Sequence, residues 1–188
     1  RSPRELRQHI RSKGFEVGIH DLYHDGKLFL TRKEFGRRAV QINRYLKEWG
    51  VTGFRSGFML HNLDWIHDLN VAYDASTFDT DPFEPQPHGQ GTIFPFWVSP
   101  SCNGIQGSGN GTPPTPLGCG YVELPYTLPQ DSTLFLLLQE RHPDIWFHKL
   151  DWIARHGGMA LVNVHPDYIR FAGERESRDS FLRPEHPT

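Results

Sequence analysis

Short apolar runs separated by longer helical patterns are the feature that most constrains the fold of this chain. Runs at residues 15–19, 71–76 and 159–164 read as strands, and they are apolar throughout rather than alternating with polar residues. Strands buried on both faces are typical of a parallel sheet covered by helices. The sequence therefore predicts an α/β fold, either a barrel or a doubly wound sheet.

The strongest helical pattern lies between Thr31 and Gly50. Thr31 and Glu34 form the pattern of a capping box, in which two side chains satisfy backbone N–H groups reciprocally. Apolar residues then recur at spacings of three and four as far as Trp49, and Gly50 supplies a stop. Further helices are expected at residues 4–13, 62–69, 134–140 and 144–155. Further strands are expected at 52–55 and 121–124, and residues 92–98 are expected to be extended.

A segment rich in Gly, Pro, Asn and Ser, residues 99–120, is expected to be a long loop inserted in one domain that spans residues 1–188. Loops of this length are often lids or binding loops. Cys102 and Cys119 flank its centre, and either a loop-closing disulfide or two free thiols agrees with the sequence.

The charge balance bears on the kind of partner. The chain has 20 basic and 22 acidic residues, a net charge of −2, with no basic run that would favour nucleic acid. A neutral substrate fits this balance better than a polyanion. No stretch of ~18 apolar residues suggests a membrane span. The sequence leaves the oligomeric state open, and it leaves the compartment open with a slight preference for the cytoplasm.

Polar residues follow the predicted strands at the ends where parallel α/β folds place their chemistry. They are His20 with His24, Arg55, Asp74 and His165. The spacing of the first two puts both imidazoles on one side of a helical turn or tight loop, where they can bind one metal ion. The alternatives are a chance pair among the 11 histidines, a structural arginine and a core histidine.

A metal site of this kind needs a third ligand, commonly a carboxylate, with one position left open for water or substrate. Asp21 and Asp25 are adjacent to the histidines. Their side chains should point away if the two histidines share a face.

Three segments resemble, in the same order, motifs of the polysaccharide deacetylases with a NodB-homology domain. FEVGIHDLYH is similar to the His-(Ser/Thr)-x-x-His motif of that family, with Asp21 where Ser or Thr is usual. GFRSGF is similar to the Arg-x-Pro motif, with Gly57 where Pro is usual, and LVNVHPDY resembles the last motif, with His165 as its histidine. YDAST and YVELPYTLPQD resemble the branch related to peptidoglycan deacetylases and allantoinase-like amidohydrolases.

The resemblance implies a distorted (β/α) barrel of about seven strands with one divalent metal ion, commonly zinc, with cobalt, nickel or manganese as alternatives. His20 and His24 match the metal-binding histidines. Arg55 matches the arginine that holds the catalytic aspartate, and His165 the acid that protonates the departing sugar amine. Substrate binding is assigned to Asp74, Tyr23 and Phe58.

One motif of the family is missing. Its Asp-Asp pair, which supplies the base and the third ligand, normally precedes the histidines, yet no aspartate precedes His20. The chain also starts without methionine, in sequence typical of the middle of a helix. We therefore expect the first strand to lie upstream, the fold to be N-terminally incomplete, and this chain alone to bind metal weakly and be inactive.

The sequence thus predicts a metal-dependent hydrolase that removes N-acetyl groups from a polysaccharide or its biosynthetic intermediate. One alternative is an allantoinase-like amidohydrolase on the same fold. The other is a non-catalytic protein that binds carbohydrate or regulates, and the residues at positions 21 and 57 favour it to some degree.

Overall fold

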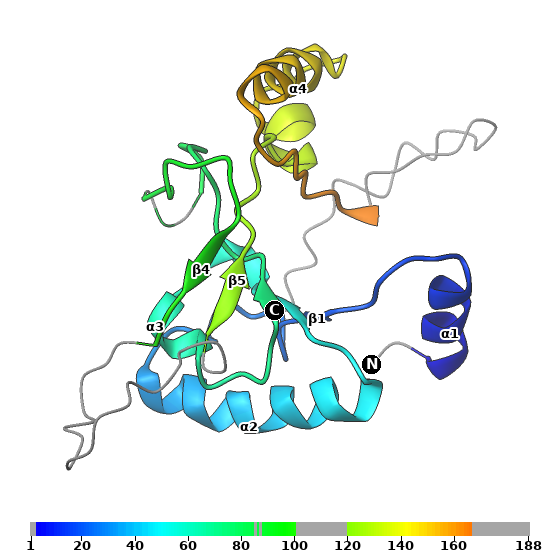
Figure 1. The fold of residues 1–188 in the computed structure, drawn as a ribbon, viewed down its shortest axis with the longest axis vertical. Coiled ribbons are helices and arrows are strands. Elements are labelled where there is room, and N and C mark those ends of the chain that lie inside the picture. The colour runs from blue at the N-terminus through cyan, green and yellow to red at the C-terminus, as the bar shows by residue number, and fades with distance from the viewer. Residues whose placement is uncertain (1–2, 85, 87, 101–119, 167–188) are drawn as a thin grey trace, which may run out of the picture.

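A computed structural model describes residues 3–84, 86, 88–100 and 120–166 as a mixed α/β fold built on a five-stranded sheet (Figure 1). Across the sheet the strands run β1 (Ile19–His20), β2 (Gly53–Arg55), β3 (Tyr73–Asp74), β5 (Tyr121–Glu123) and β4 (Phe96–Val98). The first four are parallel, and β4 is antiparallel to β5. The predicted, mainly parallel sheet is confirmed. Within the described ranges it is open, so a closed barrel of about seven strands is not shown.

The strands are shorter than the apolar runs that predicted them. β1 includes only Ile19 of the run at residues 15–19, and the run at 159–164 contributes a single parallel bridge between Val162 and Leu128. A second parallel bridge joins Phe78 to Tyr126 and extends the β3–β5 pairing. Three chain segments therefore continue in parallel beyond the regular sheet, and the segment around Val162 lies next to Leu128.

Helix α2 (Arg32–Trp49) has the ends that the sequence predicts. The hydroxyl of Thr31 accepts a hydrogen bond from the Glu34 backbone N–H at 3.1 Å, and Gly50 ends the helix with a left-handed φ of 60°. The reciprocal half of the capping box does not form. The Glu34 carboxylate instead accepts hydrogen bonds from Arg37 and Arg38.

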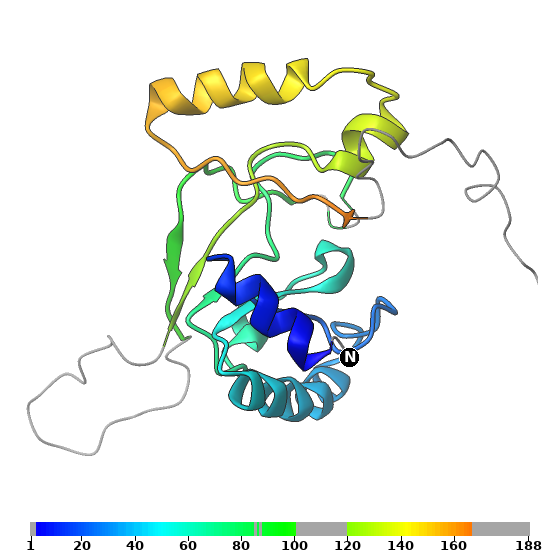
Figure 2. The ribbon, with the colours of Figure 1, turned by 90° about the vertical axis from the view of Figure 1, so that its right-hand side faces the viewer.

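The main core lies between α2 and the sheet, because the apolar face of this helix packs against strand residues. The buried members of this core are Ile19, Leu28, Phe35, Ala39, Ile42, Leu46, Val51, Phe54, Ile66, Leu69, Val98 and Tyr121. Figures 1 and 2 show α2 at one end of the molecule and α4 (Asp144–His156) at the opposite end. The sheet and its loops are thus held between two helices.

The remaining helices are short. α1 (Arg4–Ser12) has no buried residue, η1 (Gly57–Met59) is a 3-10 turn, and α3 (Leu63–Ile66) is a single turn. The helix predicted at 134–140 is found as a π-helical turn, η3, which spans Ser132–Leu137 and so begins two residues and ends three residues earlier. No described helix is long and apolar enough to cross a membrane. Most of the predicted loop at 99–120, with both cysteines, lies outside the described residues.

Candidate functional site

A cleft of about 360 Å³ brings together three of the residues predicted from the sequence. Its lining comes from the start and end of β1, from β2 and β3, and from residues 163–166. His20, Arg55 and His165 all lie on its wall. Because the parallel strands end at one edge of the sheet, these residues meet although their positions span most of the described chain.

His20 is held in one orientation by the neighbouring strand. Its Nδ1 lies 3.2 Å from the carbonyl oxygen of Arg55, which can only accept, so Nδ1 carries the proton. Burial lowers the pKa of His20, and the hydrogen bond to Arg55 opposes this shift in part. A neutral ring with Nδ1–H engaged leaves the Nε2 lone pair for a metal ion or a proton.

His24 lies next to His20, with ring centroids 5.3 Å apart and the rings tilted by 54°. His20 is the last residue of β1, and His24 lies in the loop of bends that follows this strand. Two imidazole donors make up part of a zinc site. Among the described residues, however, no group of three or more His, Cys, Asp or Glu side chains could hold a metal ion. The donor set is therefore incomplete, and the predicted metal remains a prediction.

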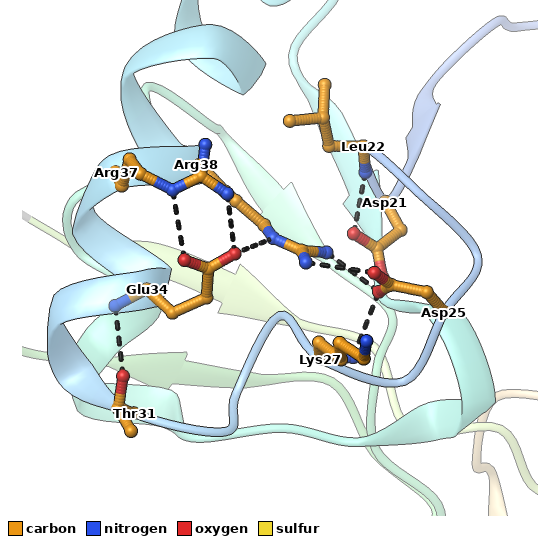
Figure 3. A network of polar contacts seen from close by, with 8 residues as sticks. All are labelled: Asp21, Leu22, Asp25, Lys27, Thr31, Glu34, Arg37 and Arg38. Atoms are coloured by element: carbon orange, nitrogen blue, oxygen red, sulfur yellow. Dashed lines mark hydrogen bonds and ion pairs between the residues drawn. The ribbon is translucent and has the colours of Figure 1, made fainter.

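The loop after β1, which carries His24, is fixed to α2 by ion pairs (Figure 3). Asp25 accepts two hydrogen bonds from Arg38, at 2.8 and 2.9 Å. Glu34 accepts a third from the same guanidinium at 2.6 Å. The Arg38 side chain is only 4% exposed, and its hydrogen bonds lower the pKa of Asp25 well below the usual range. This geometry fixes the backbone one residue after His24.

Asp21, between the histidines, turns its side chain toward Gly57. Its backbone has a left-handed φ of 57°, which aspartate tolerates better than most residues, and its side chain is 7% exposed. Oδ1 accepts a hydrogen bond from Leu22 N at 2.6 Å, and Oδ2 accepts one from Gly57 N at 3.3 Å. A Cβ on Gly57 would lie 3.0 Å from Asp21 Oδ2 and 3.2 Å from His24 Cδ2. Asp21 and His24 therefore converge on Gly57, which leaves room for both.

Two aromatic residues predicted to bind substrate are accessible. Phe58 is 46% exposed, and its ring lies 4.3 Å from the ring of His24. Tyr23 is 53% exposed and lies against the Arg38 guanidinium. Phe58 is thus an exposed ring beside His24, whereas Tyr23 is an exposed ring beside Arg38. Asp74 differs, because its side chain has no exposed surface, and its predicted contact with substrate stays a prediction.

Arg55 reaches from β2 across the cleft. Its Nε donates to the carbonyl oxygen of Ala75 at 3.0 Å, and its Nη1 donates to Asn163 Oδ1 at 2.5 Å. Burial lowers the pKa of Arg55, while the charges of Asp74 and Glu123 oppose this shift. The sequence suggested that Arg55 orients a carboxylate by direct contact. In the described part of the chain its hydrogen bonds go to neutral oxygens instead.

His165 has a partner that the sequence did not single out. Asp131 Oδ1 accepts a hydrogen bond from His165 Nδ1 at 2.6 Å, and Oδ2 accepts one from the His165 backbone N–H at 2.6 Å. Asp131 is 2% exposed and precedes η3. A carboxylate on Nδ1 fixes the tautomer and the direction of Nε2, as it does for general acid–base histidines.

Asn163 and Gln130 are a second pair that was missed. Asn163 Nδ2 donates to Gln130 Oε1 at 2.6 Å, while Asn163 Oδ1 accepts from Arg55. The only sequence signal was position: Gln130 and Asp131 end YVELPYTLPQD, and Asn163 lies two residues before His165. Their pairing links the Arg55 side of the cleft to the His165 side.

Comparisons with known proteins agree with this geometry at the level of the fold. No family model and no curated protein matches the chain. Among solved structures, it is similar to the crystal structure of a "putative polysaccharide deacetylase from Mycobacterium smegmatis", with a TM-score of 0.56 at 15% identity. The match covers 85% of this chain and 52% of that one, so this chain spans about half its length. At this identity the likeness shows a shared, deacetylase-like α/β fold.

Proposed function

We propose that this chain forms part of a metal-dependent hydrolase that removes N-acetyl groups from a polysaccharide or its biosynthetic intermediate. One observation carries the proposal: His20, Arg55 and His165 line a single cleft, and each has its ring or guanidinium fixed by a hydrogen bond. The shared fold with the M. smegmatis protein supports the same reaction class.

The cleft also suggests where the missing ligand would come from. It lies between β1, which is the outermost strand of the sheet, and residues 163–166, which follow the Val162 bridge. Both segments have their other side paired to parallel chain within the described ranges. Within the described ranges β1 is paired on one side only, so a further parallel strand would add at its other edge and end beside His20. We propose that such a strand supplies the third metal ligand and the catalytic base.

The roles of this chain's own residues follow from their hydrogen bonds. His20 and His24 would hold the metal through ring nitrogens, and a bound divalent ion polarises water and the acetamide carbonyl. In the hydrolysis, water adds to the carbonyl carbon, the C–N bond breaks, and acetate and an amine leave. His165, oriented by Asp131, would protonate the amine nitrogen. Arg55 would place its positive charge beside the catalytic carboxylate that the further strand supplies.

A non-catalytic carbohydrate-binding protein is the second candidate. The incomplete donor set among the described residues favours it. Exposed Tyr23 and Phe58 would serve that function equally well, because stacking against a sugar needs no metal. Metal content therefore separates the two candidates better than sugar binding does.

The test uses the natural protein in its full length. Elemental analysis should find one zinc or similar ion per chain, lost in His20→Ala and in His24→Ala. The exposed His142 lies outside the cleft, so His142→Ala should keep the metal. Acetate should be released from an N-acetylated sugar oligomer by the variants that keep the metal and not by those that lose it. A metal-free natural protein that still binds the oligomer would favour the second candidate. Ring opening of a cyclic amide to a carboxylate, without acetate release from the oligomer, would favour an allantoinase-like amidohydrolase.

A further inference from the structure

Two acidic side chains are completely buried at the centre of the sheet. Asp74 on β3 and Glu123 on β5 are both 0% exposed. They are direct register partners in a parallel strand pair, so their side chains point to the same face. A buried carboxylate is costly unless it is paired with a cation or fully hydrogen-bonded. Two such groups side by side need an explanation.

The hydrogen bonds of the pair are unequal and incomplete. Asp74 Oδ1 accepts one bond, from the Ser76 hydroxyl at 2.6 Å. Glu123 Oε1 accepts two, from the Thr77 backbone N–H at 3.0 Å and the Thr77 hydroxyl at 2.6 Å. The second oxygen of each, Asp74 Oδ2 and Glu123 Oε2, is buried with no donor among the described residues.

Their side chains point to the same face of two paired strands, which lie about 4.8 Å apart, so the two carboxyl groups are nevertheless within hydrogen-bonding reach of each other. Ionised carboxylates only accept, so two of them cannot form this bond, whereas one protonated carboxyl can donate to the other. The extra donors on Glu123 stabilise the negative charge there. The proton should therefore reside on Asp74 Oδ2 and point to Glu123 Oε2.

We infer that Asp74 and Glu123 share one proton at neutral pH, and that the single negative charge left on the pair is the counter-charge of the Arg55 guanidinium. This role goes beyond the proposed hydrolysis and does not depend on it. Burial raises the pKa of Asp74 well above its usual range, and it also raises that of Glu123. A carboxyl pair that retains one proton behaves in this way.

The groups around the pair agree with a single negative charge. Arg55 on β2 interacts electrostatically with both carboxyls, while its own hydrogen bonds go to neutral oxygens. Tyr121 on β5 also faces both, and its pKa is raised, mainly by burial, so it stays neutral. His61, after η1, faces Glu123. One guanidinium and one shared proton leave the buried cluster neutral overall, which a low-dielectric interior favours.

A shared proton makes stability depend on pH with a definite sign. In the unfolded chain both carboxyls lose their protons near their ordinary values of 3.8 and 4.5. The folded chain keeps one more proton, so the contribution of this pair to the free energy of unfolding is greatest below those values. As the pH rises, the unfolding constant should increase by about tenfold per unit until the raised pKa is passed.

The first test compares pH slopes in urea unfolding of the chain between about pH 6 and pH 8. The wild type should show a steeper rise of the unfolding constant than Asp74→Asn or Glu123→Gln, by about tenfold per pH unit. Glu140→Gln changes an exposed carboxyl and should keep the wild-type slope. In the double variant Asp74→Asn/Glu123→Gln, Arg55 loses its counter-charge. The increase in the unfolding constant should therefore be about tenfold larger than the product of the increases in the two single variants. Equal slopes in the wild type and both single variants would overturn the inference.

The second test works on the wild type even if the variants fold poorly. Infrared spectroscopy at pH 7 should show the C=O stretch of a buried protonated carboxyl, measured in a Glu84→Gln background because burial raises the pKa of Glu84 as well. Either single substitution at the pair should remove the band completely, since the remaining carboxylate faces Arg55 alone. Absence of the band, or its survival in Glu123→Gln, would show that the proton is not shared.

Discussion

Gly57 donates its backbone N–H to Oδ2 of Asp21 over 3.3 Å, and these are the two positions at which the chain departs from the motifs it resembles. The proline usual at position 57 has no N–H to donate. A serine or threonine at position 21 carries no buried charge that would need one. The two departures are therefore physically linked, and each makes the other tolerable.

This link predicts a double-mutant cycle with a clear coupling. Gly57→Pro alone should destabilise the chain by about 1–3 kcal/mol, because the buried Asp21 carboxylate loses a donor. In an Asp21→Ser background the same change should cost about 1–2 kcal/mol less. Urea unfolding of the four chains measures both numbers.

A control separates the lost N–H from simple crowding. Gly57→Ala keeps the N–H but places a Cβ 3.0 Å from Asp21 Oδ2 and 3.2 Å from His24 Cδ2. If crowding alone explained the effect, alanine and proline would show the same coupling with Asp21. Additivity of Asp21→Ser and Gly57→Pro to within about 0.5 kcal/mol would mean that the two departures are independent.

The Asp25–Arg38 pair should make the histidine loop sensitive to acid. The hydrogen bonds from Arg38 lower the pKa of Asp25, so its contribution is present at neutral pH and is lost as the pH falls below its ordinary value of 3.8. Asp25→Asn should therefore destabilise the chain at pH 7 and have a shrinking effect in increasingly acidic buffer. Urea unfolding from about pH 7 to pH 2 measures this, with the exposed Asp151→Asn as control. A difference from wild type that stays constant over the whole range would rule out the pair as its source.

Much of the fold was predictable because its signals are local. Thr31 and Gly50 mark the ends of α2 within a residue, since caps depend on the chemistry of a few neighbouring residues. The parallel sheet followed from uninterrupted apolar runs. β4 falls within the segment 92–98 that was expected to be extended, but nothing in the sequence indicated its antiparallel direction. The short β1 was overestimated, because pairing partners and not composition decide where a strand ends.

The candidate site was predictable only in part, for the same reason. His20, Arg55 and His165 were found because each follows an apolar run. Asp131 was missed, since its partner lies 34 residues later in the sequence and nothing local connects them. The sequence pattern did not reveal the left-handed backbone of Asp21, which turns its side chain toward Gly57.

Helix α2 offers a matched test of the core. Phe35 is 0% exposed and contacts the rings of Phe29 and Trp65, whereas Val40 on the same helix is 71% exposed. Phe35→Ala should cost about 3–5 kcal/mol of unfolding free energy, from lost burial and the cavity left behind. Val40→Ala should change it by no more than about 0.5 kcal/mol. Chemical denaturation gives both values, and a similar loss for the two would mean that α2 does not pack as described.

Asp131 should act on the proposed reaction through the ring of His165, and not by contact with substrate. Asp131→Asn replaces one acceptor oxygen by a donor, so either the ring or the backbone N–H of His165 loses its partner. Stability should fall by about 1–3 kcal/mol. Acetate release by the full natural protein should fall by about 10²-fold or more, because the ring no longer points in one direction.

A second substitution separates positioning from structural support. In a His165→Ala background the ring is already absent, so Asp131→Asn should cause no further loss of activity. The stability cost should persist there, since Asp131 also accepts hydrogen bonds from the backbone N–H groups of Ser132 and residue 165. Activity losses that multiply in the double variant would show that Asp131 works independently of His165. In that case the Asp131 carboxylate would contact the substrate and not only orient the ring of His165.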